Sequence, residues 1–155
     1  RAALWHVPHD MAAAEALSKY FSSFTGREAG DPKSVDINQR AVNLLADAPG
    51  VAWATFSTLC EEPRSAVDYV EMAREYHTIL IEQIPLLDRC KEDAALRFIK
   101  LVDELYDRNV KLIATADQAP EALYDGSRLR FEFDRTVSRL QEMRTQEYLK
   151  AEHRP

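Results

Sequence analysis

The sequence predicts an α/β fold with a small mixed sheet, which contains a β-hairpin and a parallel strand–helix–strand unit and is flanked by helices. The hairpin is indicated by Val35 and Ile37, which alternate with polar residues ahead of a possible turn at residues 38–40. The parallel unit is indicated by two short β-branched runs, residues 77–81 and 110–115, on either side of an amphipathic stretch. Two strands joined by a helix are normally parallel, with a right-handed crossover.

The first third of the chain predicts a helix followed by three strands. Residues 11–24 carry apolar side chains at helical spacing, and Gly26 follows that stretch as a helix terminator. The second hairpin strand is the apolar run at residues 41–45. Pro49-Gly50 then introduces the third strand over residues 51–56.

The middle of the chain predicts a helical turn at residues 57–61 and a short amphipathic helix after Pro63. Ser65 and Asp68 have the Ser-x-x-Asp spacing of a helix N-terminal cap, and apolar residues follow on one face. The strand at residues 77–81 comes next and ends before Pro85.

The last third of the chain predicts the second half of the parallel unit and a C-terminal helix. Residues 91–107 form the strongest helical stripe of the sequence. A turn at Asp125-Gly126 leads into the aromatic residues at 131–133, and we expect the last helix to begin at about Asp134. The tail past Lys150 is expected to fray.

Composition indicates one globular domain, residues 1–155, with an acidic surface. The net charge of −6 disfavours broad binding to nucleic acid or to an anionic membrane.

Two cysteines, Cys60 and Cys90, are too few for a disulfide framework and fit a reducing, cytosolic compartment. Because the sequence begins at Arg1 without a signal peptide, we expect it to be a piece of a longer chain.

Sites in parallel sheets lie past the carboxyl ends of the strands. Four polar residues lie at or just past the ends of the two predicted parallel strands: Glu82, Gln83, Thr115 and Asp117.

Other motifs point away from an independent active site. The sequence has no Gly-x-x-x-x-Gly-Lys-Ser/Thr loop and only four glycines, so we expect it not to hold ATP alone. His6 and His9 flank a proline and lack a second pair of ligands, so we interpret them as chance neighbours, not as a zinc site.

Four arginines gather within 12 residues near the C-terminus: Arg128, Arg130, Arg135 and Arg139. The last two are four residues apart on one face of the predicted helix, and Arg135 is expected in its first turn, where the helix dipole disfavours a cation. Two interpretations follow. The guanidinium groups bind a phosphate, or they pair internally with one of four acidic residues, Glu132, Asp134, Glu142 or Asp125.

Several phrases, in their order along the chain, resemble the C-terminal region of the ZapE-like ATPases. The most specific are Phe-Ser-Thr-Leu-Cys at 56–60, Arg-Phe-Ile-Lys-Leu-Val-Asp-Glu-Leu-Tyr-Asp at 97–107, and Phe-Asp-Arg-Thr-Val-Ser-Arg-Leu at 133–140. The resemblance covers nearly the whole chain. One position differs from the family: this chain has Leu96 where the family's Arg-Arg-Phe motif has its first arginine.

The resemblance implies a P-loop ATPase of the AAA class, in a family shared with mitochondrial ATPases, whose Walker motifs lie upstream of this C-terminal fragment. ATP and magnesium are then cofactors of the parent protein, and none is expected in the fragment alone, which should be inactive. The family phrases imply that Arg135 and Arg139 sense or stabilise phosphate charge. Arg97 is a third, weaker candidate for phosphate contact.

Two functions from different classes follow from the resemblance. In the first, the chain completes an ATPase that couples ATP hydrolysis to remodelling of a protein partner, in bacterial cell division. In the second, it is a non-catalytic interaction module for the division ring or for a membrane-protein partner. The implied partners are the upstream ATPase half, FtsZ or other division-ring proteins, and a further copy of the chain, with no nucleic acid. The implied location is the cytoplasm, including the periphery of the membrane or the division site.

Overall fold

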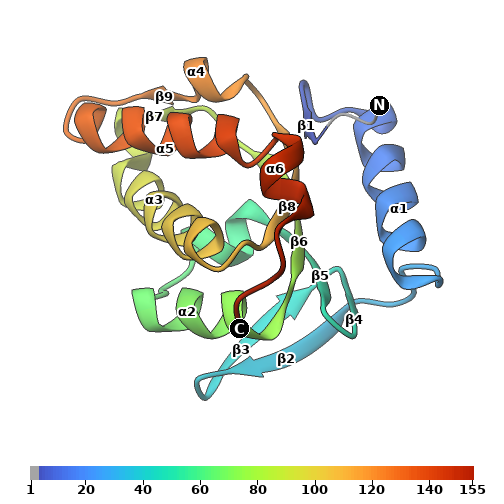
Figure 1. Ribbon diagram of the computed structural model, residues 1–155. Helices are drawn as coiled ribbons and strands as arrows, with labels where there is room; N and C mark the ends of the chain where they lie inside the picture. Colours follow the sequence, from blue (N-terminus) through green and yellow to red (C-terminus); the bar gives the residue numbers. More distant parts are fainter. Residues whose placement is uncertain (1–3) are drawn as a thin grey trace.

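A computed structural model describes residues 4–155, which contain a central five-stranded sheet with helices on both faces (Figure 1). The strand order is β1-β8-β6-β5-β4, and four of these strands run parallel while β4 is antiparallel to β5. Their bounds are β1 Trp5–His6, β4 Ala46–Ala48, β5 Val51–Thr55, β6 Thr78–Ile84 and β8 Lys111–Ala116. The predicted mixed sheet is confirmed. The short strand β4 was not predicted.

Alternation along each central strand divides the core between the two sheet faces. In β6, Leu80 packs with α1 (Met11–Thr25) on one face, while its neighbours Ile79 and Ile81 join the larger core on the other. The larger core is covered by α2 (Ala66–Glu75), α3 (Glu92–Asp107) and α5 (Arg130–Glu142), which lie together on the side of the sheet opposite α1 in Figure 1. The predictions of α1 and α3 are confirmed to within one residue at each end, and the helix predicted after Pro63 is α2.

The parallel strand–helix–strand unit is β6-α3-β8. Ile79 of β6 stands opposite Leu112 of β8 in the parallel register, and α3 connects the two strands. The register shifts between Ile81 and Ile84, next to Gln83, whose φ of 62° is unusual for a residue other than glycine. This irregularity lies at the carboxyl end of the sheet, where the sequence places its polar residues.

The predicted hairpin consists of β2 (Lys33–Ile37) and β3 (Arg40–Leu44). Both turn residues, Asn38 and Gln39, have positive φ, as a two-residue type I′ turn requires. The hairpin contacts the rest of the fold through β3, which packs against β5, and through the start of α2.

The predicted cap of α2 also fixes the hairpin. Asp68, 2% exposed, accepts a hydrogen bond from the backbone N–H of Ser65 at 3.0 Å, as a capping box requires. The same carboxylate forms an ion pair with Arg40, whose Nη1 lies 2.7 Å from it. One buried carboxylate therefore holds both the first turn of α2 and the end of the hairpin.

Short elements connect the main ones. They are the π-helix η1 (Ser57–Glu61), β7 (Leu87–Asp88), the 3-10 helix η2 (Arg89–Lys91), α4 (Pro120–Leu123), β9 (Tyr124–Asp125) and α6 (Gln146–Lys150). β7 and β9 pair in parallel beside the start of α3. None of the described helices is both long enough and apolar enough to span a bilayer.

The expectation that the C-terminal helix begins at Asp134 is wrong, because α5 begins at Arg130. The aromatic residues at 131–133 alternate like a strand in sequence, yet Phe133 is buried at helical spacing from Leu140 while Phe131 is 74% exposed. Arg135 consequently lies in the second turn of α5, away from the positive end of the helix dipole.

The expectation that the tail frays past Lys150 is also wrong. Nζ of Lys111 donates to the carbonyl oxygen of Ala151 at 2.7 Å, and the backbone N–H of Arg154 donates to Arg108 at 2.8 Å. The His153 ring donates from Nε2 to the carbonyl oxygen of Ala73 at 2.6 Å. These bonds attach the tail to the ends of α2 and α3.

Replacing Lys111 with Met should destabilise the protein by about 1–3 kcal/mol, because it leaves carbonyl oxygens without a donor. Nζ of Lys111 also donates to the carbonyls of Asn109 and Tyr148. Urea unfolding measures the change, and the exposed Lys100→Met serves as the matched control. Equal unfolding midpoints for the two variants would contradict the assigned role of Lys111.

Candidate functional site

The carboxyl edge of the sheet carries a hydrogen-bonded group of three side chains from three different parallel strands or their ends. Thr115 of β8 accepts the backbone N–H of Gln83 at 2.9 Å, and its hydroxyl lies 2.7 Å from Nδ1 of His9. Nε2 of His9 lies 3.1 Å from the side-chain amide nitrogen of Gln83. Of the residues predicted for this edge, Gln83 and Thr115 come together in the structure.

Hydrogen positions in this group follow from its donors and acceptors. The side-chain amide nitrogen of Gln83 can only donate, so Nε2 of His9 accepts and Nδ1 carries the imidazole hydrogen, while the Thr115 hydroxyl oxygen accepts the backbone N–H of Gln83. The Thr115 oxygen has a second lone pair, so it also accepts from Nδ1–H of His9. The group thus fixes the His9 imidazole beside the strained backbone at Gln83.

The other two predicted edge residues serve the fold. Glu82 accepts the indole N–H of Trp53 at 2.8 Å. Asp117 donates its backbone N–H to Ile84 at 2.9 Å and accepts the backbone N–H of Leu86 at 3.3 Å. Sequence reasoning missed His9, because its partner Thr115 is 106 residues away; its spacing from His6 is the only local signal.

Three of the four clustered arginines are paired within the protein. Arg128 lies 3.7 Å from the Glu92 carboxylate, and Arg130 lies 3.4 Å from Asp134. Arg139 pairs with Asp103 of α3 and stacks over the Tyr106 ring, 5.1 Å from its centroid. Of these acidic partners, only Asp134 was among the four that we considered from the sequence.

Arg135 differs from the other three arginines. Its side chain is exposed, and among the described residues it makes no hydrogen bond and no ion pair. It lies four residues after the exposed Phe131, so both side chains are on the same face of α5. An exposed guanidinium on α5 is therefore available to a group outside this domain.

Arg97 is placed apart from Arg135 and Arg139. Its Nη1 donates to the carbonyl oxygen of Cys60 at 3.2 Å, within η1. The nearby Arg64 likewise donates to the carbonyl oxygen of Thr58 at 3.1 Å. Two arginines thus satisfy carbonyl groups of the π-helix, and burial raises the pKa of the Cys60 thiol well above its usual range, which leaves it unreactive.

The start of α5 is held by the buried carboxylate of Glu92. It accepts hydrogen bonds from the Tyr124 hydroxyl at 2.5 Å and from the backbone N–H groups of Ser127 at 2.9 Å and Arg128 at 3.0 Å. These bonds, the one from Tyr124 foremost, lower the pKa of Glu92 to about 2. A Cβ at Gly126 would stand 2.5 Å from that carboxylate and 2.6 Å from the Tyr124 hydroxyl, so a side chain there would displace the hydrogen-bonded pair.

Neutralising Glu92 by Glu92→Gln should lower the melting temperature at neutral pH, because both carboxylate oxygens accept hydrogen bonds and the amide replaces one of them with an NH2 group that cannot accept. The carboxylate has a folded pKa of about 2 against its usual 4.5, so its stabilisation is complete above pH 4.5 and is lost as pH falls towards 2. The difference between the two proteins, followed by thermal unfolding, should shrink across that window.

The exposed neighbour Asp93 supplies the control, because Asp93→Asn removes a charge from the same helical turn, and the Asp93 side chain makes no hydrogen bond or ion pair with any described residue. A Glu92→Gln protein that melts at the control's temperature at pH 7 would contradict the role assigned to the carboxylate.

Comparison with known proteins gives one family and several relatives. The family model described as "AFG1-like ATPase" matches residues 1–152. The chain is 39% identical over 154 residues to the cell division protein ZapE of Escherichia coli K12, which covers 99% of this chain and 41% of that protein. It is 28% identical over 179 residues to lactation elevated protein 1 homolog B of Danio rerio, covering 94% of this chain and 36% of that protein.

A Schizosaccharomyces pombe protein is 32% identical over 111 residues, covering 71% of this chain and 24% of its own length. No solved structure matches the chain. The chain spans less than half the length of the curated relatives it matches.

Proposed function

The chain belongs to the AFG1-like ATPase family, and from that premise we propose that it is the C-terminal part of a ZapE-like ATPase. The parent protein would couple ATP hydrolysis to the remodelling of a protein partner in bacterial cell division. Its location would be the cytoplasm, at the membrane periphery or division site, and its partners would include division-ring proteins such as FtsZ and a further copy of the chain.

The residues of this chain do not fit an ATP and magnesium site. The sequence lacks a phosphate-binding loop, and the described residues contain no cluster of three His, Cys, Asp or Glu side chains that would hold a metal ion. ATP would therefore be bound elsewhere in the parent protein. The contribution of this chain would be made by a side chain that reaches out from it.

Arg135 is the observation that supports this proposal most directly. Burying a guanidinium beside phosphate oxygens is favourable because the charge is permanent and its planar fork matches two oxygens. An arginine already paired with a carboxylate would first have to leave it. Among the described residues Arg135 has no such partner, unlike the other three arginines of its cluster, so it is the residue we assign to phosphate contact.

Arg139 and Arg97 would act differently under this proposal. Arg139 bridges α5 to Asp103 of α3, and so positions the helix that carries Arg135. Arg97 bridges α3 to η1. Arg97 and Asp103, which make these two contacts, are six residues apart on α3, roughly 9 Å along its axis. The two contacts therefore stabilise different neighbours of α3. Each arginine would reach a phosphate only by giving up these bonds.

A second candidate function is a non-catalytic interaction module, and the exposed Phe131 favours it. An aromatic side chain left 74% exposed on a helix is costly in water and typical of a surface that another protein covers. The same face of α5 would then bind a partner through Phe131, with Arg135 as a peripheral cation. The two functions predict different effects of removing Arg135: ATP turnover falls if the residue contacts phosphate, and it is unchanged if this face only binds a partner.

Replacing Arg135 with Ala in the parent protein should lower ATP turnover at least about tenfold, since an arginine on transition-state phosphate contributes about 10³ to 10⁵ in kcat. The loss should appear in kcat, measured by phosphate release. Arg144→Ala removes another exposed arginine from the segment just after α5 and should leave turnover unchanged.

Unchanged turnover in the Arg135→Ala parent would contradict the catalytic assignment. If Phe131→Ala then weakened partner binding while turnover stayed normal, the interaction module would be the function of this face.

A further inference from the structure

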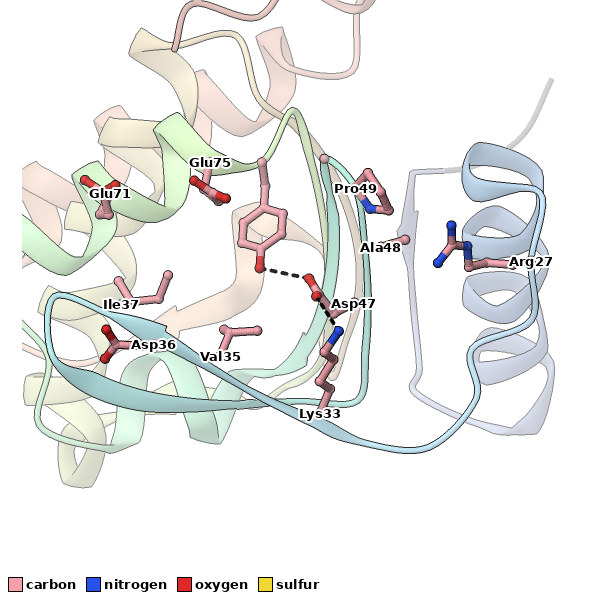
Figure 2. A pocket seen from close by; sticks show the side chains of 12 residues that line it. Arg27, Lys33, Val35, Asp36, Ile37, Asp47, Ala48, Pro49, Glu71 and Glu75 are labelled. Carbon is pink, nitrogen blue, oxygen red and sulfur yellow. Dashed lines mark hydrogen bonds and ion pairs between the residues drawn. The ribbon is translucent and has the colours of Figure 1, made fainter.

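A hollow of about 470 Å³ opens between the hairpin, β4 and the C-terminal end of α2 (Figure 2). It is separate from α5 and from the carboxyl-edge group, which contribute none of its lining residues. Its apolar lining comes from the β2 residues Val35 and Ile37, and from Ala48 and Pro49 at the turn between β4 and β5. The hollow therefore has a partly apolar surface that is not filled by the protein's own side chains.

Acidic side chains outnumber basic ones around the hollow. Four carboxylates line it against two cations, Arg27 and Lys33. One carboxylate, Asp47, is used within the fold, because it accepts the Tyr76 hydroxyl at 2.9 Å and lies 3.7 Å from Lys33. Figure 2 draws both contacts as dashed lines that end on Asp47.

The remaining three carboxylates are free or weakly held. The side-chain carboxylates of Asp36 and Glu75 make no hydrogen bond and no ion pair with any described residue. Glu71 reaches only Arg74 on its own helix, at 4.0 Å. Asp36 comes from β2, and the two glutamates come from α2, so carboxylates stand on two different walls of the hollow (Figure 2).

The hollow also meets an unpaired strand edge. β2 pairs only with β3 among the described strands. In a hairpin with a two-residue turn, the residues flanking the turn exchange hydrogen bonds, and the alternate residues point their backbone groups away from the partner strand. Ile37 flanks the turn, so Ser34 and Asp36 are the alternate residues. Residues 35, 36 and 37 all line the hollow, as expected of a strand that presents its edge.

We propose that this hollow binds an extended, cationic peptide segment of a partner protein, which pairs with the edge of β2 and places Lys or Arg side chains beside Asp36, Glu71 and Glu75. Strand addition gives such a segment its backbone hydrogen bonds, and the alternating side chains reach the carboxylates and the apolar surface. The charge of the walls selects against acidic segments by like-charge repulsion. This proposal is independent of the ATPase proposal.

Other occupants fit the hollow less well. Nucleic acid is disfavoured because its phosphates would face the unpaired carboxylates. A metal ion would need converging ligands, and the described residues hold no group of three His, Cys, Asp or Glu side chains suited to one. An uncharged apolar segment would leave the carboxylates without partners as water is displaced.

The test is fluorescence anisotropy with the parent protein and a labelled ten-residue peptide of alternating lysine and valine. We expect saturable binding that Asp36→Lys weakens at least tenfold. Glu15→Lys makes the same charge change on the exposed face of α1 and should leave the affinity unchanged. Asp36→Asn, which alters shape least, should weaken binding in the same direction, and circular dichroism confirms that each variant is folded.

Two further peptides separate strand pairing from simple charge attraction. A peptide of alternating glutamate and valine should not bind. The lysine peptide with N-methylated backbone amides keeps its charge but cannot pair with β2, and it should bind at least tenfold more weakly. The proposal is overturned if the lysine peptide does not bind, if Glu15→Lys weakens binding as much as Asp36→Lys, or if N-methylation has no effect.

Discussion

The packing of α3 onto the β6–β8 pair is the constraint on which the rest of the structure depends. Phe98 of α3 is fully buried, and its ring centroid lies 5.8 Å from that of Phe56 and 6.3 Å from that of Phe133. It therefore joins the end of β5 and the helix α5 to one apolar centre. Aromatic side chains of this size contribute more to a core than any of the surface ion pairs around it.

Polar side chains of α3 then fix the segments that pack around it, namely η1, the loop before α5, and α5 itself. Glu92 at its start holds the loop before α5, Arg97 satisfies a carbonyl of η1, and Asp103 holds Arg139. The orientation of α5, and with it the direction in which Arg135 extends, thus follows from one helix. A carboxylate or guanidinium used in this way is already paired within the fold, so it would have to leave its partner to bind a ligand.

Sequence reasoning predicted the elements well and their polar partners poorly. Local periodicity determines a helix such as α3 or a hairpin turn at Asn38, because the signal lies within a few residues. The pairing of His9 with Thr115 depends on which strands become neighbours, and no local pattern encodes that. The start of α5 was misplaced for the same reason, because the donors and acceptor that fix it lie about 35 residues apart.

The unpaired carboxylate of Asp36 has a further consequence for how the protein behaves when concentrated. Exposed strand edges are sites at which copies of a protein join into insoluble, sheet-like aggregates, and charges along the edge are a common protection. Two copies that approached each other through β2 would bring their Asp36 side chains, and the nearby glutamates, together. Repulsion at this edge would keep the hairpin soluble while leaving its backbone groups open to a segment of opposite charge.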